Sequence, residues 1–404
     1  MTARCRGKFK KQIFWPIYFL SLLTFQFFSS IPLHAVEPVK ICLLLSGPRS
    51  SMSTDRAYRW GAEMAVGEVN SSEGRQGVQL ILVLRRGPHF HRKALKELRE
   101  LLLEEQARFL MGVMDKEDIL PVSRIARELN IPFLVFPIDF IEAASTVGEP
   151  GSLFWISPAP EAFQRAAVRT VAAFSAHRYY LLARNSSIGR SWAQYFWEEL
   201  RKLKPTAQRV GETFLPTKVQ YFKPYIQGVL SAKAEVCISQ LGVPEWPDFV
   251  ELAKKQDYFK KVIHFEMESG GLESLIALGK KAPEGVWGAS AFPFWALGWK
   301  ETKEFVQKFK EKHEAYPNLS ALSAYITIYA IFETMKKLGS YDYQKAVHAL
   351  ETLTLRTPIG PLAIRRSDHR VMWPIWCGSL KYNSDYPFPI LGDLKAFGPD
   401  SFSP

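Results

Sequence analysis

The sequence has little cysteine. Its four cysteines form neither a CxxC pair nor a set with the spacing of zinc ligands, which excludes a disulfide-rich secreted domain and a zinc-finger-like domain. Cys42, Cys237 and Cys377 each lie inside an apolar, strand-like run. We therefore expect them to be small buried side chains, and a single disulfide with one leftover thiol is the alternative.

Signatures of the common enzyme classes are also absent. The chain contains no GxGxxG, GxxxxGK[ST], GxSxG or HExxH motif. A Ser/His/Asp triad built from distant residues stays open, because such groups meet only in space. His89 and His91 could bind a metal only with partners distant in sequence, so we interpret this segment as a solvated loop. The sequence predicts no enzyme, no metal and no cofactor.

A concentrated patch of one charge sign is missing as well. The net charge is +12, but five of the positive charges lie in residues 1–11 and the remaining excess is spread along the chain. A nucleic-acid-binding protein usually has a concentrated basic face, so we expect no nucleic-acid partner. The length of 404 residues and the 47% hydrophobic content are typical of a globular protein with two or three domains.

One long uncharged apolar run is present. Ile13–Phe28 follows a basic leader and precedes a short segment that ends at Ala35. This order predicts a secretory signal peptide over residues 1–35, cleaved near Ala35. A retained membrane anchor is the alternative, although the run is shorter than the about 20 residues of a spanning helix and contains Pro16.

Apolar runs alternate with amphipathic segments in the rest of the chain. Runs such as Val39–Leu45 are typical of parallel strands covered on both faces. The alternation predicts an α/β fold with doubly wound parallel sheets, and two successive series imply two lobes. The first series has expected strands at 39–45, 78–84, 109–113 and 133–136 and helices at 61–70, 92–106 and 121–130. The second has expected strands at 179–183, 209–214, 235–240, 261–265 and 285–289 and helices at 191–204, 222–232 and 247–256.

The remaining C-terminal segment is too small to form a third core. It contains expected helices at 302–313 and 321–338 and two hairpin-like strands at 361–366 and 372–380. We expect these pieces to complete the two lobes, with three crossings near Ile156, Ser290 and Pro358. Lobe 1 would then comprise 36–156 plus 290–358, and lobe 2 would comprise 157–289 plus 359–404.

Two groups of side chains could take part in ligand binding. Asp115, Glu117 and Asp118 follow the third expected strand, and ligands of open α/β sheets bind at the carboxyl ends of strands. Stabilisation of the next helix N-terminus is the alternative. An aromatic group could line a ligand site or pack the core. Its members are Trp287, Phe292, Phe294, Trp295 and Trp299.

The order and spacing of several segments resemble a known family. They include SGP at 46–48, GAEMAVGEVN at 61–70, IGRSWAQYFWEELRKLKP at 188–205, EGVWGAS at 284–290 and AYPNLSALSAYITIYAIFETMKKLGSYD at 315–342. Through most of the chain they are similar to the type I periplasmic substrate-binding proteins of branched-chain amino acid ABC transporters, the leucine/isoleucine/valine-binding family.

The resemblance implies a fold and a function. It implies two lobes joined by a three-crossing hinge that close around a small amino-acid-like or amide-like ligand. It further implies a periplasmic monomer without catalytic activity that delivers this solute to an ABC transporter permease in the inner membrane. An exported ligand-sensing module of the same fold, serving a signalling receptor, is the alternative. An exported hydrolase is the second alternative.

The resemblance also indicates ligand-binding positions. Asp118 stands where the family has a hydroxyl residue that binds the ligand carboxylate, and Glu266 approximately matches the acid that receives the ligand ammonium. Ile138 and Phe140 replace a small residue and a threonine, and Ile188 replaces a tyrosine. Gln240 ends a strand that lines the same cleft. These differences imply a ligand that is neutral or cationic where it faces Asp118, such as an amide, a urea-like compound or an amine.

Overall fold

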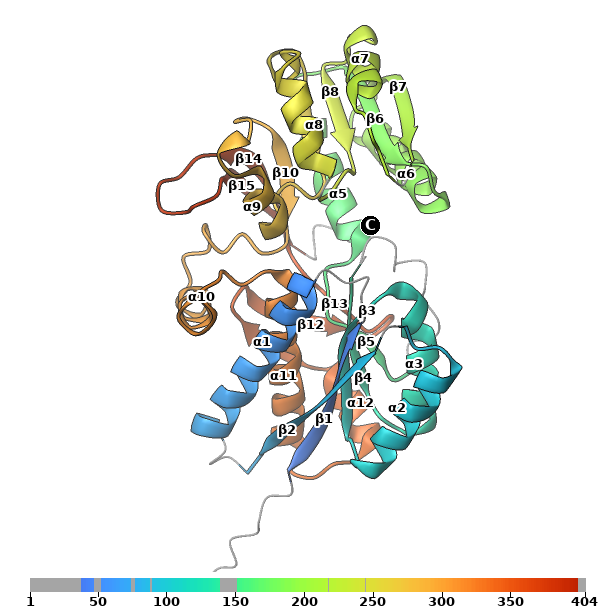
Figure 1. The fold of residues 1–404 in the computed structure, drawn as a ribbon, viewed down its shortest axis with the longest axis vertical. Helices are drawn as coiled ribbons and strands as arrows, with labels where there is room; N and C mark the ends of the chain where they lie inside the picture. The colour runs from blue at the N-terminus through green and yellow to red at the C-terminus, as the bar shows by residue number, and fades with distance from the viewer. Residues whose placement is uncertain are drawn as a thin grey trace, which may run out of the picture. The chain divides into compact units, whose positions relative to one another are not determined.

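The computed structural model describes residues 38–46, 52–73, 77–87, 89–138, 151–216, 218–243 and 245–398. The expected signal peptide and Phe140 lie outside these residues. Two sheets, each covered by helices on both faces, form the fold (Figure 1). The expectation of an α/β fold with two lobes is confirmed. Within the described ranges, no helix has the length and hydropathy needed to span a membrane.

The first sheet has the strand order β11-β12-β13-β5-β4-β3-β1-β2. Its strands from β5 to β2 are parallel, and β11 and β12 form an antiparallel edge. The strands are β1 (Val39–Ser46), β2 (Leu80–Gly87), β3 (Phe109–Met114), β4 (Phe133–Pro137), β5 (Leu153–Trp155), β11 (Thr354–Thr357), β12 (Gly360–Arg365) and β13 (Arg370–Val371). The helices are α1 (Met52–Glu68), continued by a π-helical turn (Val69–Glu73), α2 (Arg92–Glu104), α3 (Lys116–Glu128), α10 (Lys300–His313), α11 (Leu319–Leu338) and α12 (Tyr343–Glu351).

The second sheet has the order β15-β14-β10-β9-β8-β6-β7, in which β14 and β15 are antiparallel to the parallel strands. Its strands are β6 (Arg178–Arg184), β7 (Gln208–Leu215), β8 (Val236–Ser239), β9 (Ile263–Glu266), β10 (Trp287–Ser290), β14 (Ile375–Lys381) and β15 (Ile390–Phe397). The helices beside it are α5 (Pro160–Ala172), α6 (Ser187–Leu203), α7 (Lys223–Ser231), α8 (Glu245–Lys254) and α9 (Leu272–Leu278).

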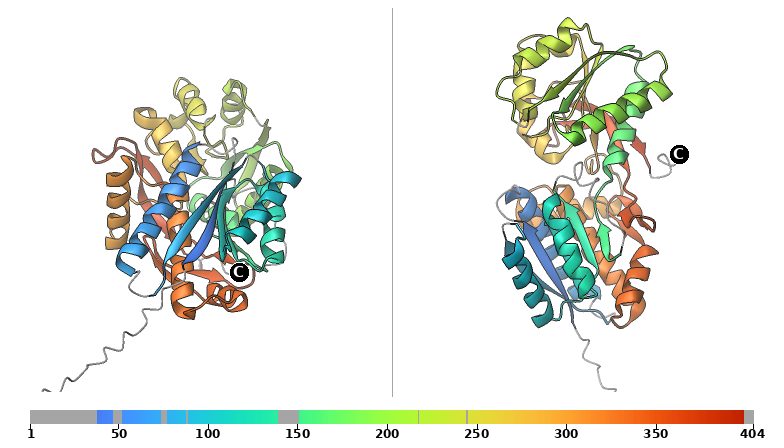
Figure 2. Two further views of the ribbon diagram at one scale, coloured as in Figure 1. Left: turned by 60° about the horizontal axis from the view of Figure 1, so that its bottom comes forward. Right: turned by 90° about the vertical axis from the view of Figure 1, so that its right-hand side faces the viewer.

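Both lobes combine segments that are distant in sequence. In Figure 2, blue and orange segments share one α/β lobe, whereas green, yellow and red segments share the other. The chain passes from the first sheet to the second after Trp155, returns after Ser290 and leaves the first sheet again after Val371. The last passage differs from the expected crossing near Pro358, because β12 and β13 pair within the first sheet.

The expected C-terminal hairpin is therefore only partly formed. β12 pairs with the two-residue strand β13, and the next strand, β14, joins the other sheet. The intervening residues include Pro374, which has no backbone N–H to donate to a ladder. The sequence predicts one strand at 372–380. The structure instead has a short connection at 372–374, followed by β14 from Ile375.

Several helices begin earlier than expected from the sequence, and the differences are largest for α1, α3 and α6. α1 begins at Met52 rather than at Gly61, and α3 begins at Lys116 rather than at Pro121. Proline is favoured in the first turn of a helix, but Pro121 lies in the second turn of α3. Asp115 occupies the N-cap position instead, and two acidic residues follow it in the first turn, where the helix dipole favours negative charge.

The three cysteines of the described chain, Cys42, Cys237 and Cys377, are buried and unpaired. This confirms the expectation of buried small side chains. Burial raises the pKa of each thiol to about 12. The thiols therefore stay protonated at neutral pH and pack as small apolar groups.

Helix α11 packs closely on α1, and a glycine makes this possible. A Cβ added at Gly61 would lie 2.1 Å from the carbonyl oxygen of Ala321, whereas a Cβ added at Gly67 would meet nothing within 4 Å. We expect Gly61→Ala to lower the free energy of unfolding by about 1–3 kcal/mol through overpacking. The matched change Gly67→Ala should raise it by about 0.5–1 kcal/mol, because alanine favours a helix. Urea unfolding of both variants checks this, and equal effects would contradict the packing argument.

Candidate functional site

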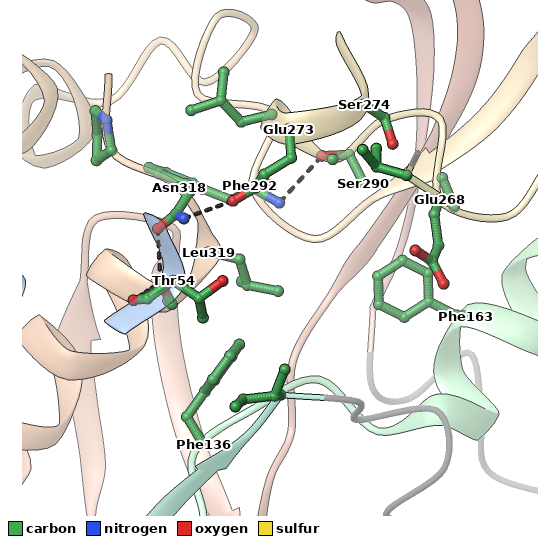
Figure 3. Close-up of a pocket in the computed structure, with 17 residues that line it drawn as sticks. Thr54, Phe136, Phe163, Glu268, Glu273, Ser274, Ser290, Phe292, Asn318 and Leu319 are labelled. Atoms are coloured by element: carbon green, nitrogen blue, oxygen red, sulfur yellow. Dashed lines mark hydrogen bonds between the residues drawn. The ribbon is translucent and has the colours of Figure 1, made fainter. Parts of the chain in front are cut away.

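A cavity of about 250 Å³ is lined by elements of both lobes (Figure 3). The ends of β4 and β10 contribute to it, as do the N-terminal parts of α9 and α11. Open α/β sheets bind ligands at such carboxyl ends of strands. The lining residues are Thr54, Phe136, Ile138, Phe163, Val243, Glu268, Gly271, Leu272, Glu273, Ser274, Ala289, Ser290, Phe292, Pro317, Asn318, Leu319 and Ser320.

The lining of this cavity combines aromatic rings with acidic groups. Phe136, Phe163 and Phe292 supply three rings, and Glu268 and Glu273 supply two carboxylates. Among the described residues that line the cavity, none is Lys, Arg or His. An anionic ligand group would therefore find no cationic side chain among these described lining residues. A flat or apolar body with a neutral or positive polar group fits this surface better.

Asn318 connects the two lobes at this cavity. Its Nδ2 donates a hydrogen bond of 2.6 Å to Oε1 of Glu273, which lies on α9 in the other lobe (Figure 3). Its Oδ1 accepts from the backbone N–H of Ala321 at 3.0 Å and so caps α11. Ser320 Oγ also donates to this Oδ1, at 2.8 Å. The amide is thus fixed by three partners and holds Glu273 at the edge of the cavity.

Glu266, expected to receive a ligand ammonium, does not line this cavity. Its side chain is fully buried at the end of β9. Its Oε1 accepts from the backbone N–H groups of Leu241 at 3.1 Å, Gly242 at 3.3 Å and Glu268 at 3.3 Å. Oε2 accepts from the hydroxyl of Ser239. Glu266 therefore holds together the chain segments behind the cavity, and Glu268, two residues further on, reaches the cavity itself.

A chain of buried side chains continues from Glu266 within the second lobe. Ser239 Oγ lies 2.7 Å from Nε2 of His264, and Nδ1 of His264 lies 3.0 Å from the hydroxyl of Tyr258. Burial lowers the pKa of His264 to about 3 and raises that of Glu266 to about 7. The imidazole is therefore neutral at physiological pH. Ser239 and His264 are at most 1% exposed, so this serine–histidine pair is inaccessible to a substrate.

Ile188 and Gln240 lie together, in a second cavity of about 230 Å³ on the second lobe. Phe163 lines both this cavity and the larger one. The second cavity also contains Trp192 and Tyr195 of α6. Two of the expected ligand residues are thus brought together next to the main cavity but do not line it.

The other expected ligand residues are dispersed. Ile138 lines the main cavity, directly after β4. Asp118 is buried in the first turn of α3, where its Oδ1 accepts from the backbone N–H of Phe90 at 2.9 Å, and it lines no described cavity. The structure thus brings Ile138 to the main cavity and Ile188 with Gln240 to the adjacent one.

Sequence reasoning missed Glu268, Glu273 and Asn318 as cavity residues. A signal existed for Asn318, because an asparagine directly before a long apolar run is a typical N-cap. Glu268 and Glu273 carry no such signal, since they lie in a turn and in a helix of about two turns whose orientation the sequence does not define.

Only one member of the aromatic group lines the main cavity, namely Phe292. Phe294 stacks on Tyr316, with ring centroids 5.5 Å apart. Trp295 donates its Nε1–H to the carbonyl oxygen of Leu391 at 2.9 Å. Trp287 packs against Phe174 at 5.0 Å. The packing interpretation therefore holds for most of this group.

Comparison with solved structures supports the same fold. A solute-binding protein of an ABC transporter from R. palustris, in complex with 4-hydroxybenzoate, is 15% identical with a TM-score of 0.74, and the match covers 91% of this chain and 99% of that one. A leucine-, isoleucine-, valine-, threonine- and alanine-binding protein from Brucella ovis is 17% identical with a TM-score of 0.74 and coverages of 91% and 97%. No curated protein matches the sequence.

A third similar structure is the substrate-binding protein of an amino acid ABC transporter from Pseudomonas fluorescens Pf-5. It is 18% identical with a TM-score of 0.74, and the match covers 90% of this chain and 97% of that one. The family model described as periplasmic binding protein matches residues 38–385, which is most of the chain. This confirms the resemblance noted in the sequence: the chain belongs to the periplasmic binding protein family.

Proposed function

We propose that the protein is the solute-binding component of an ABC importer and captures its ligand by closure of the two lobes. The observation that carries this proposal is the cavity of about 250 Å³ lined by residues of both lobes. A ligand held by groups on both sides stabilises the closed arrangement, and such hinge motion is common in two-lobe binding proteins. For this motion we propose lobes of 38–156 plus 291–372 and of 157–290 plus 373–398, supported by the sheet pairing.

The proposed ligand has an aromatic or branched apolar body and a neutral or cationic head. The three phenylalanine rings support the apolar body, and Glu268 and Glu273 support the head. A ligand carboxylate placed about 4 Å from either glutamate would be repelled by roughly 1–4 kcal/mol. An ammonium would be attracted to a similar extent. We propose no catalytic step, since the Ser239–His264 pair lies buried outside the cavity.

Ligand binding by this cavity can be measured with a small panel. We expect benzylamine and benzamide to raise the melting temperature of the purified protein, and benzoate to have little effect. Glu268→Gln and Glu273→Gln should each weaken benzylamine binding by about 10- to 100-fold, the loss of roughly 1.4–2.7 kcal/mol. Isothermal titration calorimetry checks these values.

The matched control is Glu100→Gln, an exposed glutamate on α2 that is absent from the cavity lining. It should leave benzylamine binding unchanged. Tight binding of benzoate or leucine that is undiminished in both cavity variants would contradict the proposed ligand class. Capture of any solute by the wild-type protein would still support the binding function.

We further propose export to the periplasm with cleavage near Ala35, and delivery of the ligand by a monomer to an inner-membrane permease. The basic leader and the uncharged run Ile13–Phe28 support export. Membership of the periplasmic binding protein family supports the same location.

A further inference from the structure

A histidine and two aspartates gather away from the ligand cavity. Asp115 and Asp118 lie at the N-terminus of α3, directly after β3, and His89 lies between β2 and α2. Each side chain places one donor atom within 4.8 Å of the others. None of the three lines the ligand cavity. This cluster is therefore separate from the proposed solute site.

Asp118 provides the strongest observation. The residue is only 5% exposed, and one carboxylate oxygen, Oδ1, accepts from the backbone N–H of Phe90 at 2.9 Å. The other oxygen, Oδ2, is buried and makes no hydrogen bond. It lies 3.4 Å from Nδ1 of His89. A buried charged oxygen without a hydrogen bond is unfavourable unless a cation or another donor compensates it.

Asp115 and His89 are positioned in unusual ways. Asp115 is the N-cap of α3, but its side chain makes no capping hydrogen bond to its own helix, although aspartate is among the best capping residues. His89 has a positive φ of 44°, which is uncommon for a residue other than glycine. Its side chain is 40% exposed. The cluster is thus buried on the Asp118 side and accessible to solvent on the His89 side.

Two simpler explanations account for only part of this geometry. Capping of α3 does not explain it, because the N-cap side chain of Asp115 makes no capping hydrogen bond, and Oδ1 of Asp118 accepts from the segment before α2. An ion pair between His89 and Asp118 would explain their contact but not the approach of Asp115. Two ligands of a tetrahedral zinc ion, each about 2.1 Å from the metal, lie about 3.4 Å apart. The His89–Asp118 distance has this value.

We propose that His89, Asp115 and Asp118 bind a divalent transition-metal ion of the Zn²⁺ type, with water completing the coordination. One imidazole nitrogen and two carboxylate oxygens are ligands that zinc accepts. Calcium requires six to eight oxygen ligands, more than these side chains supply. The metal would fasten the segment before α2 to the N-terminus of α3, at the carboxyl edge of the first sheet. The site is independent of the solute cavity.

The experiment is a calorimetric titration of the EDTA-treated, dialysed protein with Zn²⁺ and, separately, with Ca²⁺. We expect one equivalent of Zn²⁺ to bind and to raise the melting temperature, and Ca²⁺ to bind at least 100-fold more weakly. His89→Asn and Asp115→Asn should each weaken Zn²⁺ binding at least tenfold. Asparagine tolerates positive φ at position 89 and caps helices at position 115, so both variants should fold. Asp118→Asn is a third variant with the same expectation.

The matched control is His91→Asn. His91 accepts the N–H of Ala94 at the start of α2, a capping role that asparagine can retain. This variant should bind Zn²⁺ like the wild-type protein. Three results would overturn the proposal: no Zn²⁺ binding by folded wild-type protein, equal affinity for Ca²⁺, or undiminished binding in both His89→Asn and Asp115→Asn.

Discussion

Trp246→Ala is expected to lower the free energy of unfolding by about 3–5 kcal/mol, because it removes a large buried side chain. Trp246 lies in the first turn of α8 and is fully buried. Its ring stacks on Phe249, with centroids 5.8 Å apart, and on His264, with centroids 5.1 Å apart. The cavity left by alanine would lie beside the buried His264, where neighbouring rings cannot collapse easily. Urea unfolding followed by circular dichroism measures the loss.

Trp246→Phe is the matched control for this prediction. The indole Nε1 of Trp246 has no hydrogen-bond partner in the described structure. Phenylalanine therefore keeps an aromatic ring in the core and removes an unsatisfied donor, so the loss should be less than half of that for alanine. If alanine and phenylalanine destabilise the protein equally, ring packing does not explain the role of this residue.

Glu266 is expected to make the protein less stable as the pH rises from about 4.5 to about 7. Burial raises the pKa of its carboxyl group to about 7 in the folded protein, from 4.5. Below pH 4.5 the group is protonated in both states. Between the two values the unfolded chain has released this proton while the folded chain still holds it, so stability falls with rising pH. The full difference is on the order of 3 kcal/mol.

Glu266→Gln should remove this pH dependence. Glutamine has nearly the same shape and cannot ionise, and its Nε2 can donate to the hydroxyl of Ser239, which is free to rotate. The free energies of unfolding of wild type and variant are measured in urea at pH 4.5 and at pH 8. The difference between the two proteins should therefore change by about 3 kcal/mol between these pH values. The control Glu100→Gln should follow the wild type. If the free energy of unfolding depends on pH in the same way for wild type and Glu266→Gln, the folded protein does not hold a proton on Glu266 in this pH range.

The central strands could be predicted from the sequence because burial leaves a strong pattern. β1 and β3 are covered on both faces, and nearly every residue in them is apolar. The short elements carry no such pattern. β5 has three residues and β13 has two, so their pairing with each other, at Arg370 and Trp155, depends entirely on the surrounding fold. The third crossing was misplaced for this reason.

The site was harder to predict than the fold, because side-chain direction depends on local chain geometry. The family resemblance led to Glu266, but β9 ends at this residue and the chain then turns. Alternation along a strand no longer applies beyond that point, and Glu268 rather than Glu266 reaches the cavity. Likewise, nothing in the sequence relates His89 to Asp118, which belong to different connections of the first sheet.

Helix α11 has a consequence for how the protein can be synthesised. It is buried along most of its length and packs on α1, β3 and β4, which precede it by a large part of the chain. The ribosome therefore releases the first five strands and α1 long before the helix that covers them. A nascent chain that stops before Leu319 would leave uncovered the surface of α1, β3 and β4 on which α11 packs. Until α11 has been synthesised, this surface lacks its native cover, although α1 still has β1, β2 and β3 to pack against.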